Sequence, residues 1–329
     1  MARNLGWAVV GCGWVARDFV VPAIQASTNG RLVAACDLDP QALSALGGGG
    51  FVRTTSLPEL LRTDGVDAVY IAAPNNAHQA LTSQVAAAGK HVLCEKPMAC
   101  NSADARAMAA DCAAAGVTLA TAFDQRYHAA HRTLSSMVRQ GHLGDVTQAR
   151  LHYACWLPPG WATDNWRIDP ARAGGGAVID LAPHGLDLLE MVLDDRIEQL
   201  LCMTQHRVHG YAVEDGGVLL ARLASGTLAT LHVGYNCPET YPRRVLEIIG
   251  TQARALAVNT MGQTAGGSLS LIRAADGHEE AVPLIDDHCP FRLQIQAFAD
   301  AVLDHQPYAY PAARDVRLAT LLWDALSCH

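Results

Sequence analysis

The sequence predicts an α/β protein of two domains: a doubly wound parallel sheet, then an α+β domain with an open, mostly antiparallel sheet. Residues 1–123 alternate short apolar runs with Ala-rich helical segments, the order that builds a parallel sheet through right-handed crossovers. After about residue 145 the apolar runs are longer, alternate with polar residues and are joined by turn signals. That pattern is typical of an antiparallel sheet with one covered face. We therefore expect one domain over 1–123 and a second over 124–329.

The buried strands of the first domain follow from short apolar runs bounded by turn residues. Residues 77–88 and 102–115 lie between such runs and are rich in Ala and other good helix formers, so we expect helices there. Strand, helix, strand order at this spacing favours a parallel sheet. The expected strands cover residues 6–10, 31–37, 66–74, 90–97 and 117–123.

The second domain is expected to pack helices against its sheet. Residues 124–144 have the pattern of a helix closed by a glycine. Residues 172–193, RAGGGAVIDLAPHGLDLLEMVL, contain a glycine turn that leads into an apolar helix, the main helix of this domain. The expected strand segments are 145–156, 218–235 and 243–258, and closing helices are expected at 291–303 and 312–328.

The composition indicates a well-packed soluble globule. Of the 329 residues, 50% are hydrophobic and only 17% are charged, which disfavours a disordered or coiled-coil chain. The formal net charge is -8, and Lys and Arg never gather in a run. Because nucleic acids and anionic membranes bind clustered positive charge, neither is an expected partner.

The cysteines and the N-terminal stretch indicate a cytoplasmic protein. The ten cysteines are scattered and form no Cys-x-x-Cys pair, so neither a zinc knuckle nor a thioredoxin-type site is indicated. We expect reduced, mostly buried thiols. Residues 1–14 contain only a short apolar run before a glycine turn, too short for a secretory signal or a membrane span.

A dinucleotide-binding signature follows the first expected strand. Gly11, Gly13 and Ala16 form the pattern G-x-G-x-x-A at the start of an expected helix. In such a turn the backbone approaches a pyrophosphate closely, and the small third residue lets helix and strand pack. The second strand leads to Asp37, whose carboxylate can accept hydrogen bonds from ribose hydroxyls. It would repel a 2′-phosphate and no arginine follows it, so we expect NAD rather than NADP as the cofactor.

The segment CEKP, residues 94–97, ends another expected strand. Ligands of open α/β sheets bind beyond the carboxyl ends of the strands. Glu95 and Lys96 are therefore expected to emerge where a ligand binds. A solvated loop charge is the alternative interpretation of Lys96.

Six motifs follow one another along nearly the whole chain, and their order and spacing are specific. They are Gly11-x-Gly13-x-x-Ala16, APNNAH at 73–78, Glu95-Lys96-Pro97, WRIDPARAGGG at 166–176, Asp180-x-x-x-His184 and VED at 213–215. Together they resemble the family of glucose-fructose oxidoreductase, inositol dehydrogenase and rhizopine-catabolism proteins, usually written Gfo/Idh/MocA.

The resemblance implies a Rossmann domain that binds NAD(P), and a second domain whose sheet commonly forms homodimers or homotetramers. It also implies oxidation of a ring hydroxyl in a sugar or cyclitol, or the reverse reduction. Lys96, Asp180 and His184 match the family's catalytic trio. The residues expected to bind the cofactor are Gly11, Gly13, Trp14, Val15, Ala16, Asp37, Ala73, Pro74, Asn75, His78, Glu95, Lys96, Gln125, Trp166 and Arg167.

Asp180, His184 and Asp187 interrupt an otherwise apolar helix, where an unpaired buried polar group costs about 1 to 3 kcal/mol. A metal site needs further ligands. No His-Glu-x-x-His motif or cysteine cluster supplies them, and His128-x-x-His131 fits a solvated helix, so no metal is expected. Asp187 is assigned to a core hydrogen bond or an arginine pair. Asp180 and His184 share a helical face and are assigned to proton transfer with Lys96.

In this assignment His184 is the general base, because imidazole titrates near neutral pH. Lys96 polarises the hydroxyl or carbonyl oxygen, and Asp180 orients both. The sequence leaves open which of His184 and Lys96 takes the proton. Many family members have a glycine two residues after the aspartate, where this chain has Ala182 and Pro183. Proline fits a helix only in its first turn or at a kink, which leaves a shift in the trio's geometry open.

Two other functions remain open from the sequence: a sugar-nucleotide ketoreductase of the same family, and a dinucleotide-binding regulatory protein without turnover. The Trp-rich loop 156–166 fits sugar stacking or an aromatic plug equally well. No phosphate-binding cluster is visible, which favours an unphosphorylated substrate. The side chains expected to set specificity are Arg126, Tyr127, His152, Trp161, Tyr235 and His288.

Overall fold

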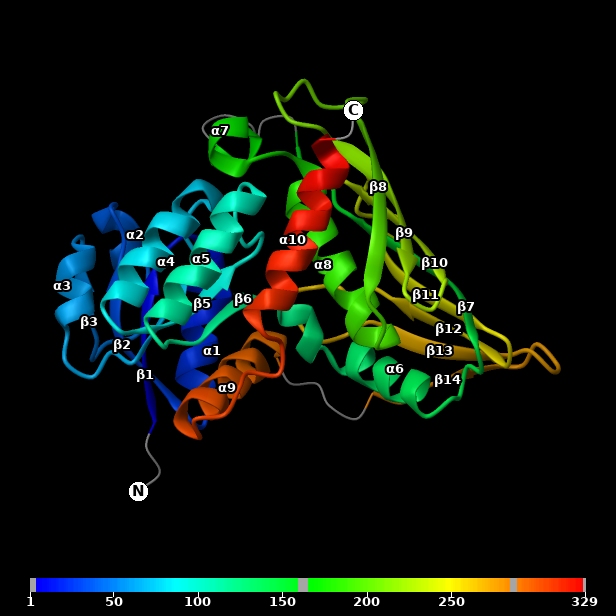
Figure 1. Cartoon of the computed structure of the whole chain (residues 1–329), viewed down its shortest axis with the longest axis horizontal. Coiled ribbons are helices and arrows are strands. Elements are labelled where there is room, and N and C mark those ends of the chain that lie inside the picture. The colour runs from blue at the N-terminus through cyan, green and yellow to red at the C-terminus, as the bar shows by residue number, and fades with distance from the viewer. Residues whose placement is uncertain (1–3, 159–164, 285–288, 328–329) are drawn as a thin grey trace. The chain divides into compact units, whose positions relative to one another are not determined.

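The computed structural model describes residues 4–158, 165–284 and 289–327, and the chain divides into two compact units (Figure 1). The first unit comprises Met1–Phe123 and Phe291–Thr320, and the second comprises Asp124–Pro290 and Leu321–His329. The first division falls between residues 123 and 124. The return of residues 291–320 to the first unit differs from the expected domain 124–329.

A parallel sheet of six strands, in the order β3-β2-β1-β4-β5-β6, forms the centre of the first unit. Every neighbouring pair in it is parallel. The strand order reverses between β1 and β4, which confirms the doubly wound fold. Only β3 is absent from the expected strands, because its three residues are too few to give a periodic signal. The strands are β1 (Leu5–Val10), β2 (Gly30–Cys36), β3 (Val52–Thr54), β4 (Ala68–Ile71), β5 (His91–Glu95) and β6 (Leu119–Ala122).

Helices connect these strands, and Figure 1 shows α4 and α5 side by side. Side chains of Asp39, Ser56 and Asn101 accept a backbone N–H at the starts of α2, α3 and α5. Such N-caps satisfy donors that the helix itself cannot pair. The elements are η1 (Ala16–Val20), α1 (Val21–Ala26), α2 (Pro40–Ser44), α3 (Leu57–Arg62), η2 (Asn75–Ala77), α4 (His78–Ala87) and α5 (Ser102–Ala114).

Two late helices, α9 (Pro290–Leu303) and α10 (Ala312–Ser327), explain the return of the chain to the first unit. Phe298 of α9 packs on Trp7 of β1, with ring centroids 5.4 Å apart. The buried carboxylate of Asp315, in α10, accepts the backbone N–H of Thr121 at 3.1 Å. These contacts join residues far apart in sequence, so local patterns could not assign the segment.

The second unit is built on a sheet of eight strands, in the order β14-β13-β12-β11-β7-β10-β9-β8. Only the β7–β10 pair is parallel, and the other pairs are antiparallel. This confirms the expected open, mostly antiparallel sheet. The strands are β7 (Val146–Ala154), β8 (Ile197–Gln205), β9 (Gly216–Leu223), β10 (Leu228–Gly234), β11 (Arg244–Gly250), β12 (Ala253–Val258), β13 (Ser268–Arg273) and β14 (Glu279–Ala281).

The long helix α8 (Ala177–Leu193) covers one face of this sheet and contacts β7, β9 and β10. A Cβ atom at Gly185 would lie 2.6 Å from Leu231 Cδ2, so glycine is what allows this close approach. Pro183 lies inside the helix rather than in its first turn, and the helix continues through it to Leu193. The other helical segments are η3 (Asp124–Tyr127), α6 (Ala129–Arg139), η5 (Trp166–Ile168) and α7 (Pro170–Ala173).

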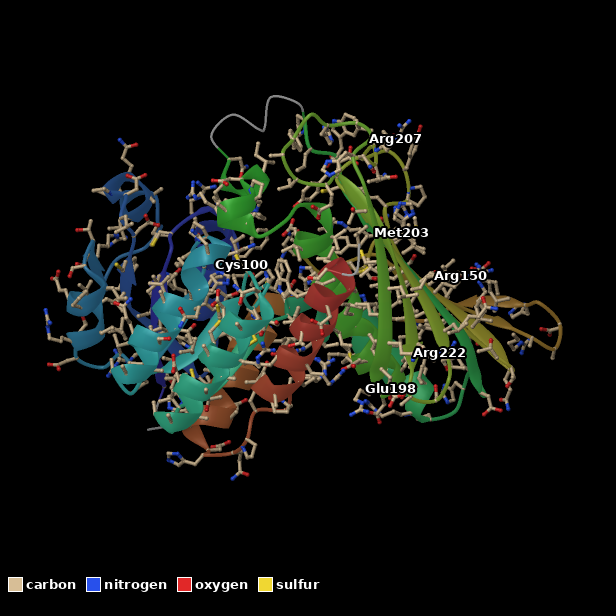
Figure 2. All side chains as sticks on the ribbon, turned by 45° about the horizontal axis from the view of Figure 1, so that its top comes forward. Cys100, Arg150, Glu198, Met203, Arg207 and Arg222 are labelled. Atoms are coloured by element: carbon tan, nitrogen blue, oxygen red, sulfur yellow. The ribbon has the colours of Figure 1, made fainter. Side chains whose placement is uncertain are left out.

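The opposite face of the sheet, here called the open face, carries exposed apolar side chains on neighbouring strands. Figure 2 labels Arg150, Met203 and Arg222, which project from this face. Its exposed large apolar residues are Leu201, Met203, Val218, Leu220 and Leu228.

Among the helices of the described residues, none is both long and apolar enough to cross a membrane.

Candidate active site

The glycine turn after β1 has the geometry that the G-x-G-x-x-A pattern predicts. Gly11 has φ +87, and a Cβ atom there would lie 2.6 Å from the backbone of Ala72 and Ala73. Only glycine combines that left-handed backbone with so close an approach. The N–H of Gly11 donates to the Cys36 carbonyl at 2.9 Å. The turn therefore gathers the carboxyl ends of β1, β2 and β4 at one place.

The next residues leave an accessible backbone at the start of the helix. Nothing lies within 4 Å of a Cβ built on Gly13, and its carbonyl accepts the Arg17 N–H at 2.9 Å. Ala16 is fully buried, which lets the helix pack closely on the sheet. Trp14 is 41% exposed and meets Phe19 edge-on, and Val15 is half-buried. The turn over residues 11–16, here called the glycine cradle, has backbone N–H groups that can bind a pyrophosphate.

Asp37, just beyond β2, lies beside the same turn. Its Oδ2 accepts the Cys12 N–H at 2.6 Å, and its Oδ1 accepts the Asp39 N–H at 2.8 Å. The half-buried carboxylate is therefore held in place, as recognition of a ribose would require. Sequence reasoning missed Arg53, which lies on the adjoining strand β3 and pairs in register with Ala35. Its guanidinium donates to the carbonyls of Leu43, Leu46 and Gly48.

His78 connects two of the loops expected to hold the cofactor. Its Nδ1 lies 3.0 Å from the Pro97 carbonyl oxygen, and its Nε2 lies 3.0 Å from the Ala73 carbonyl oxygen. The ring is completely buried, and burial lowers its pKa. The side chain is therefore placed to support these loops rather than to present a surface to a cofactor. Ala73 and Pro74 are partly exposed, whereas Asn75 is buried.

Glu95 and Lys96 emerge at the carboxyl end of β5, as predicted, and both are partly exposed. The hydroxyl of Tyr70 on β4 donates to Glu95 Oε1 at 2.6 Å. The other carboxylate oxygen accepts the Lys96 N–H at 3.2 Å. Tyr70, a residue that the sequence pattern did not single out, therefore positions Glu95.

In the second unit, the VED segment holds the start of α8. The Glu214 carboxylate accepts the N–H of Gly176 at 2.9 Å and that of Val178 at 3.0 Å. A negative charge at the first turn stabilises a helix. Asp215 accepts backbone N–H groups of Arg207, Val208 and His209. Burial acts to raise the pKa of Asp215, but these hydrogen bonds outweigh it and lower the pKa.

Asp180 lies in the first turn of α8 and is fixed by a residue beyond β10. The Tyr235 hydroxyl donates to Asp180 Oδ2 at 2.9 Å. Tyr235 is 2% exposed, so it belongs to the support of Asp180 and not to the substrate-facing set in which the sequence places it.

His184 lies one turn further along α8, at 5% exposure. The Tyr153 ring meets the imidazole edge-on, with centroids 5.5 Å apart. Nδ1 of His184 lies 3.9 Å from Oδ1 of Asp124. Gln125 Nε2 donates to the other oxygen of Asp124 at 2.8 Å and also to the Gly262 carbonyl. Sequence reasoning missed Asp124, and Gln125, expected at the cofactor, has a buried amide that donates within this unit.

Asp187 forms the arginine pair that was one of its predicted alternatives. Arg126 donates to both of its oxygens at 2.8 to 3.0 Å, and both side chains have no exposure. The assignment of Arg126 to substrate specificity is therefore wrong, because this guanidinium neutralises a buried carboxylate. His128 and His131 are also buried, not solvated as expected, because α6 packs against α8.

The other predicted residues fall in three places. His152 lies on the open face, where its ring neighbours that of His232, and so not on the face covered by α8. Trp166 and Arg167 lie in η5, partly exposed, with the guanidinium 4.5 Å above the indole ring. Tyr127 is partly exposed in η3. Trp161, His288 and Cys328 lie outside the described residues.

The trio is divided between the units, with Lys96 in the first and Asp180 and His184 in the second. A contact of Lys96 with either residue stays a prediction. Within the described ranges, no three His, Cys, Asp or Glu side chains are arranged to hold a metal ion. The site residues are thus a fixed carboxylate, Asp180, and a histidine, His184, on α8, and a lysine, Lys96, at the end of β5.

Two family models match the chain. A model described as oxidoreductase family, NAD-binding Rossmann fold, matches residues 5–123. The GFO/IDH/MocA C-terminal domain model matches residues 131–256. Together they cover most of both units.

Individual relatives agree with these matches. The chain is 34% identical over 307 residues to 1,5-anhydro-D-fructose reductase of Ensifer adhaerens, covering 92% of this chain and 90% of the relative. It is 31% identical over 298 residues to D-xylose 1-dehydrogenase (NADP(+)) 2 of Haloferax volcanii, covering 90% and 88%. The solved structure of GenD2 from gentamicin A biosynthesis in complex with NAD has a TM-score of 0.83 and 27% identity, covering 99% of this chain and 93% of that one.

Proposed function

The chain belongs to the Gfo/Idh/MocA family of oxidoreductases, and from that premise we propose that it is an NAD-dependent dehydrogenase that oxidises a ring hydroxyl of a sugar or cyclitol to a ketone. The observation that carries the proposal is the Tyr235 hydrogen bond to Asp180, one turn before His184 on the same helix. It gives a carboxylate of fixed orientation beside a histidine, as proton transfer requires.

In this proposal His184 takes the hydroxyl proton while the carbinol carbon loses a hydride. A bound nicotinamide would supply the hydride acceptor. Asp180 orients the imidazole, and Lys96 donates a hydrogen bond to the substrate oxygen and stabilises the negative charge that develops there.

The glycine cradle and Asp37 support NAD as the cofactor. A Cβ at Gly11 would fill the close approach to Ala72, and the fixed carboxylate of Asp37 would repel a 2′-phosphate. Arg53 is the nearest opposing argument, but its guanidinium is already bound to three carbonyls. The ratio of kcat/KM for NAD to that for NADP tests this choice, and a clear NADP preference would reject it.

The assay of the main proposal uses D-glucose, D-xylose and myo-inositol with NAD, followed by the absorbance of NADH. His184→Ala and Lys96→Ala should each lower kcat by about 10² to 10⁴ while NADH binding persists. His206→Ala, at an exposed histidine, is the matched control. Near-full activity of either site variant would reject the assignment.

A ketoreductase acting on a sugar or sugar nucleotide is the second candidate, because the Ensifer adhaerens relative is named a reductase. The same residues would then return a proton to the new alkoxide. Turnover of ketoses with NADH but not of the alcohols with NAD would favour it. NADH binding without any turnover would favour a regulatory dinucleotide-binding protein.

We also propose that the protein is cytoplasmic and forms homodimers or homotetramers through the open face. The exposed apolar side chains of that face, such as Met203 at 75% and Leu201 at 65%, are the supporting observation. Met203→Glu should dissociate the oligomer, which light scattering coupled to size-exclusion chromatography would show as a lower molar mass. A monomeric wild-type protein would contradict the proposal.

A further inference from the structure

A hollow of about 370 Å³ opens in the second unit at the start of β11. Its size lies in the range of small-molecule sites. All the residues around it belong to the second unit, so its shape depends on that unit alone. The lining residues are Glu239, Thr240, Tyr241, Pro242, Arg243, Arg244 and Asn259.

Among the described residues, none is recorded as an acceptor for the Arg244 guanidinium, whereas two neighbouring arginines have carboxylate partners. Arg243 pairs with Glu239 at 2.8 Å, and Arg254 pairs with Glu247. The side chain of Arg244 is only partly exposed, and its Nε is buried without a hydrogen-bond partner. Within the described part of the chain, no carboxylate forms an ion pair with it. A guanidinium without a carboxylate partner keeps its positive charge available to an anionic ligand at the hollow.

The surroundings hold this guanidinium in position. Its Cζ lies 5.7 Å from the centroid of the Tyr153 ring, which is the distance of a cation–π contact. A Cβ at Gly262 would lie 2.7 Å from Nη1, so the glycine leaves room for the arginine. The backbone carbonyl of Arg244 accepts the Asn259 N–H at 2.7 Å. The site is therefore built before any ligand binds.

Tyr153 also connects this arginine to the proposed reaction centre. Tyr153 and Arg244 are register partners on β7 and β11. The same phenol ring and the His184 ring form a T-shaped pair, with centroids 5.5 Å apart. His184 and Arg244 therefore both neighbour one aromatic residue. A substrate whose hydroxyl reaches His184 could place a substituent several bonds away at Arg244.

We propose that Arg244 binds an oxyanion, a carboxylate or a phosphate, carried by the substrate at a position remote from the carbon that is oxidised. The guanidinium can donate two parallel hydrogen bonds to either group. This inference rests on the proposed function for the identity of the substrate as a sugar, but the anion site itself depends only on the second unit. It makes the preferred substrate a sugar acid or a sugar phosphate rather than a neutral sugar.

The test compares D-glucose with D-glucuronate and D-glucose 6-phosphate, in wild type and in Arg244→Gln. Wild type should prefer one of the anionic sugars by about 10-fold or more in kcat/KM, and the preferred one identifies carboxylate or phosphate as the bound group. Arg244→Gln should abolish the preference and leave kcat/KM for D-glucose within about 3-fold. Arg254→Gln, which removes a charge already paired with Glu247 and lies outside the hollow, should keep the preference.

Calorimetric titration of D-glucuronate and D-glucose 6-phosphate into the same proteins separates this inference from the proposed function. Binding to wild type but not to Arg244→Gln, without turnover of any sugar, would support the anion site and reject the dehydrogenase. Turnover of D-glucose with no preference for either anion would do the reverse. The anion site would be overturned if Arg244→Gln lowered kcat/KM equally for neutral and anionic sugars. It would also be overturned if wild type neither bound the anionic sugars nor turned over any sugar.

Discussion

The phenolic O–H of Tyr235 donates a hydrogen bond to Asp180 Oδ2 at 2.9 Å, and the backbone of Tyr235 is itself hydrogen-bonded through both its N–H and its carbonyl. Its N–H donates to the Asp215 carbonyl at 2.8 Å, and its carbonyl oxygen lies 3.0 Å from His209 Nε2. Burial and the negative charge of Asp180 raise the pKa of Tyr235 well above its usual value, so it stays a donor at neutral pH. The orientation of Asp180 is therefore set by a strand end and a loop outside α8.

Tyr235→Phe should lower kcat while leaving NADH binding intact. Losing one hydrogen bond to a charged group costs about 1.5 to 3 kcal/mol, which corresponds to roughly 10- to 100-fold in rate. Steady-state kinetics and NADH fluorescence titration measure the two quantities. Tyr211→Phe is the matched control, because its hydroxyl donates to the Pro158 carbonyl. Wild-type kcat in Tyr235→Phe would show that Asp180 needs no such support.

Asp124→Asn should lower kcat and move the acidic limb of the kcat/KM profile to lower pH. The Asp124 carboxylate lies 3.9 Å from His184 Nδ1 and favours the imidazolium that forms when His184 takes a proton. The amide keeps the shape and removes the charge. A pH series from 5 to 9 distinguishes this electrostatic effect from a packing defect, because a defect would lower the rate equally at every pH. An unshifted limb would contradict the role.

Gly11→Ala should abolish NAD binding without unfolding the second unit. Alanine at φ +87 is strained, and its Cβ would meet the Ala72 backbone at 2.6 Å. The turn would have to open, and the N–H groups of the cradle would move from the pyrophosphate. NADH titration and circular dichroism give the two readouts. Gly50→Ala, also at positive φ but with open space around it, is the control for strain alone. Normal NADH affinity in Gly11→Ala would count against the cradle.

The protein should lose stability as the pH falls from about 6.5 toward 4. Burial lowers the pKa of His128 to about 4 and that of His131 to about 3. Below pH 6.5 these two imidazoles bind protons in the unfolded chain but stay neutral in the folded protein, so acid favours unfolding. Thermal unfolding at pH 7.5 and pH 5 measures the loss.

His128→Asn should reduce this pH dependence, since asparagine can keep the N-cap acceptor of α6 but does not titrate. The exposed His206→Asn variant is the control. An identical fall in Tm between pH 7.5 and pH 5 in wild type and His128→Asn would contradict the assignment.

The sequence predicts the fold well where the signal is periodic. Apolar runs predicted the strands of the first sheet except β3. In the second sheet they predicted β7 and β9 to β12 but not β8, β13 or β14. The glycines marked the turn after β1. The prediction of α8 as a buried helix with Asp187 in an arginine pair is confirmed. The segment 291–320 shows the limit, because α9 is recognisable as a helix but its contacts with Trp7 join opposite ends of the chain.

The candidate site divides in the same way. Residue types, spacing and the family resemblance predicted Gly11, Asp37, Lys96, Asp180 and His184 as site residues, because backbone geometry and proton chemistry restrict which residues can serve there. Only the tertiary structure decided which side chains support them. It moved Arg126 and Tyr235 from the substrate to the interior, and brought Asp124 to His184 and Arg244 to Tyr153. A local pattern predicts helices, strands and the burial of apolar residues, whereas the burial of a polar side chain and the identity of its partner are set by strand pairing and helix packing between residues distant in sequence.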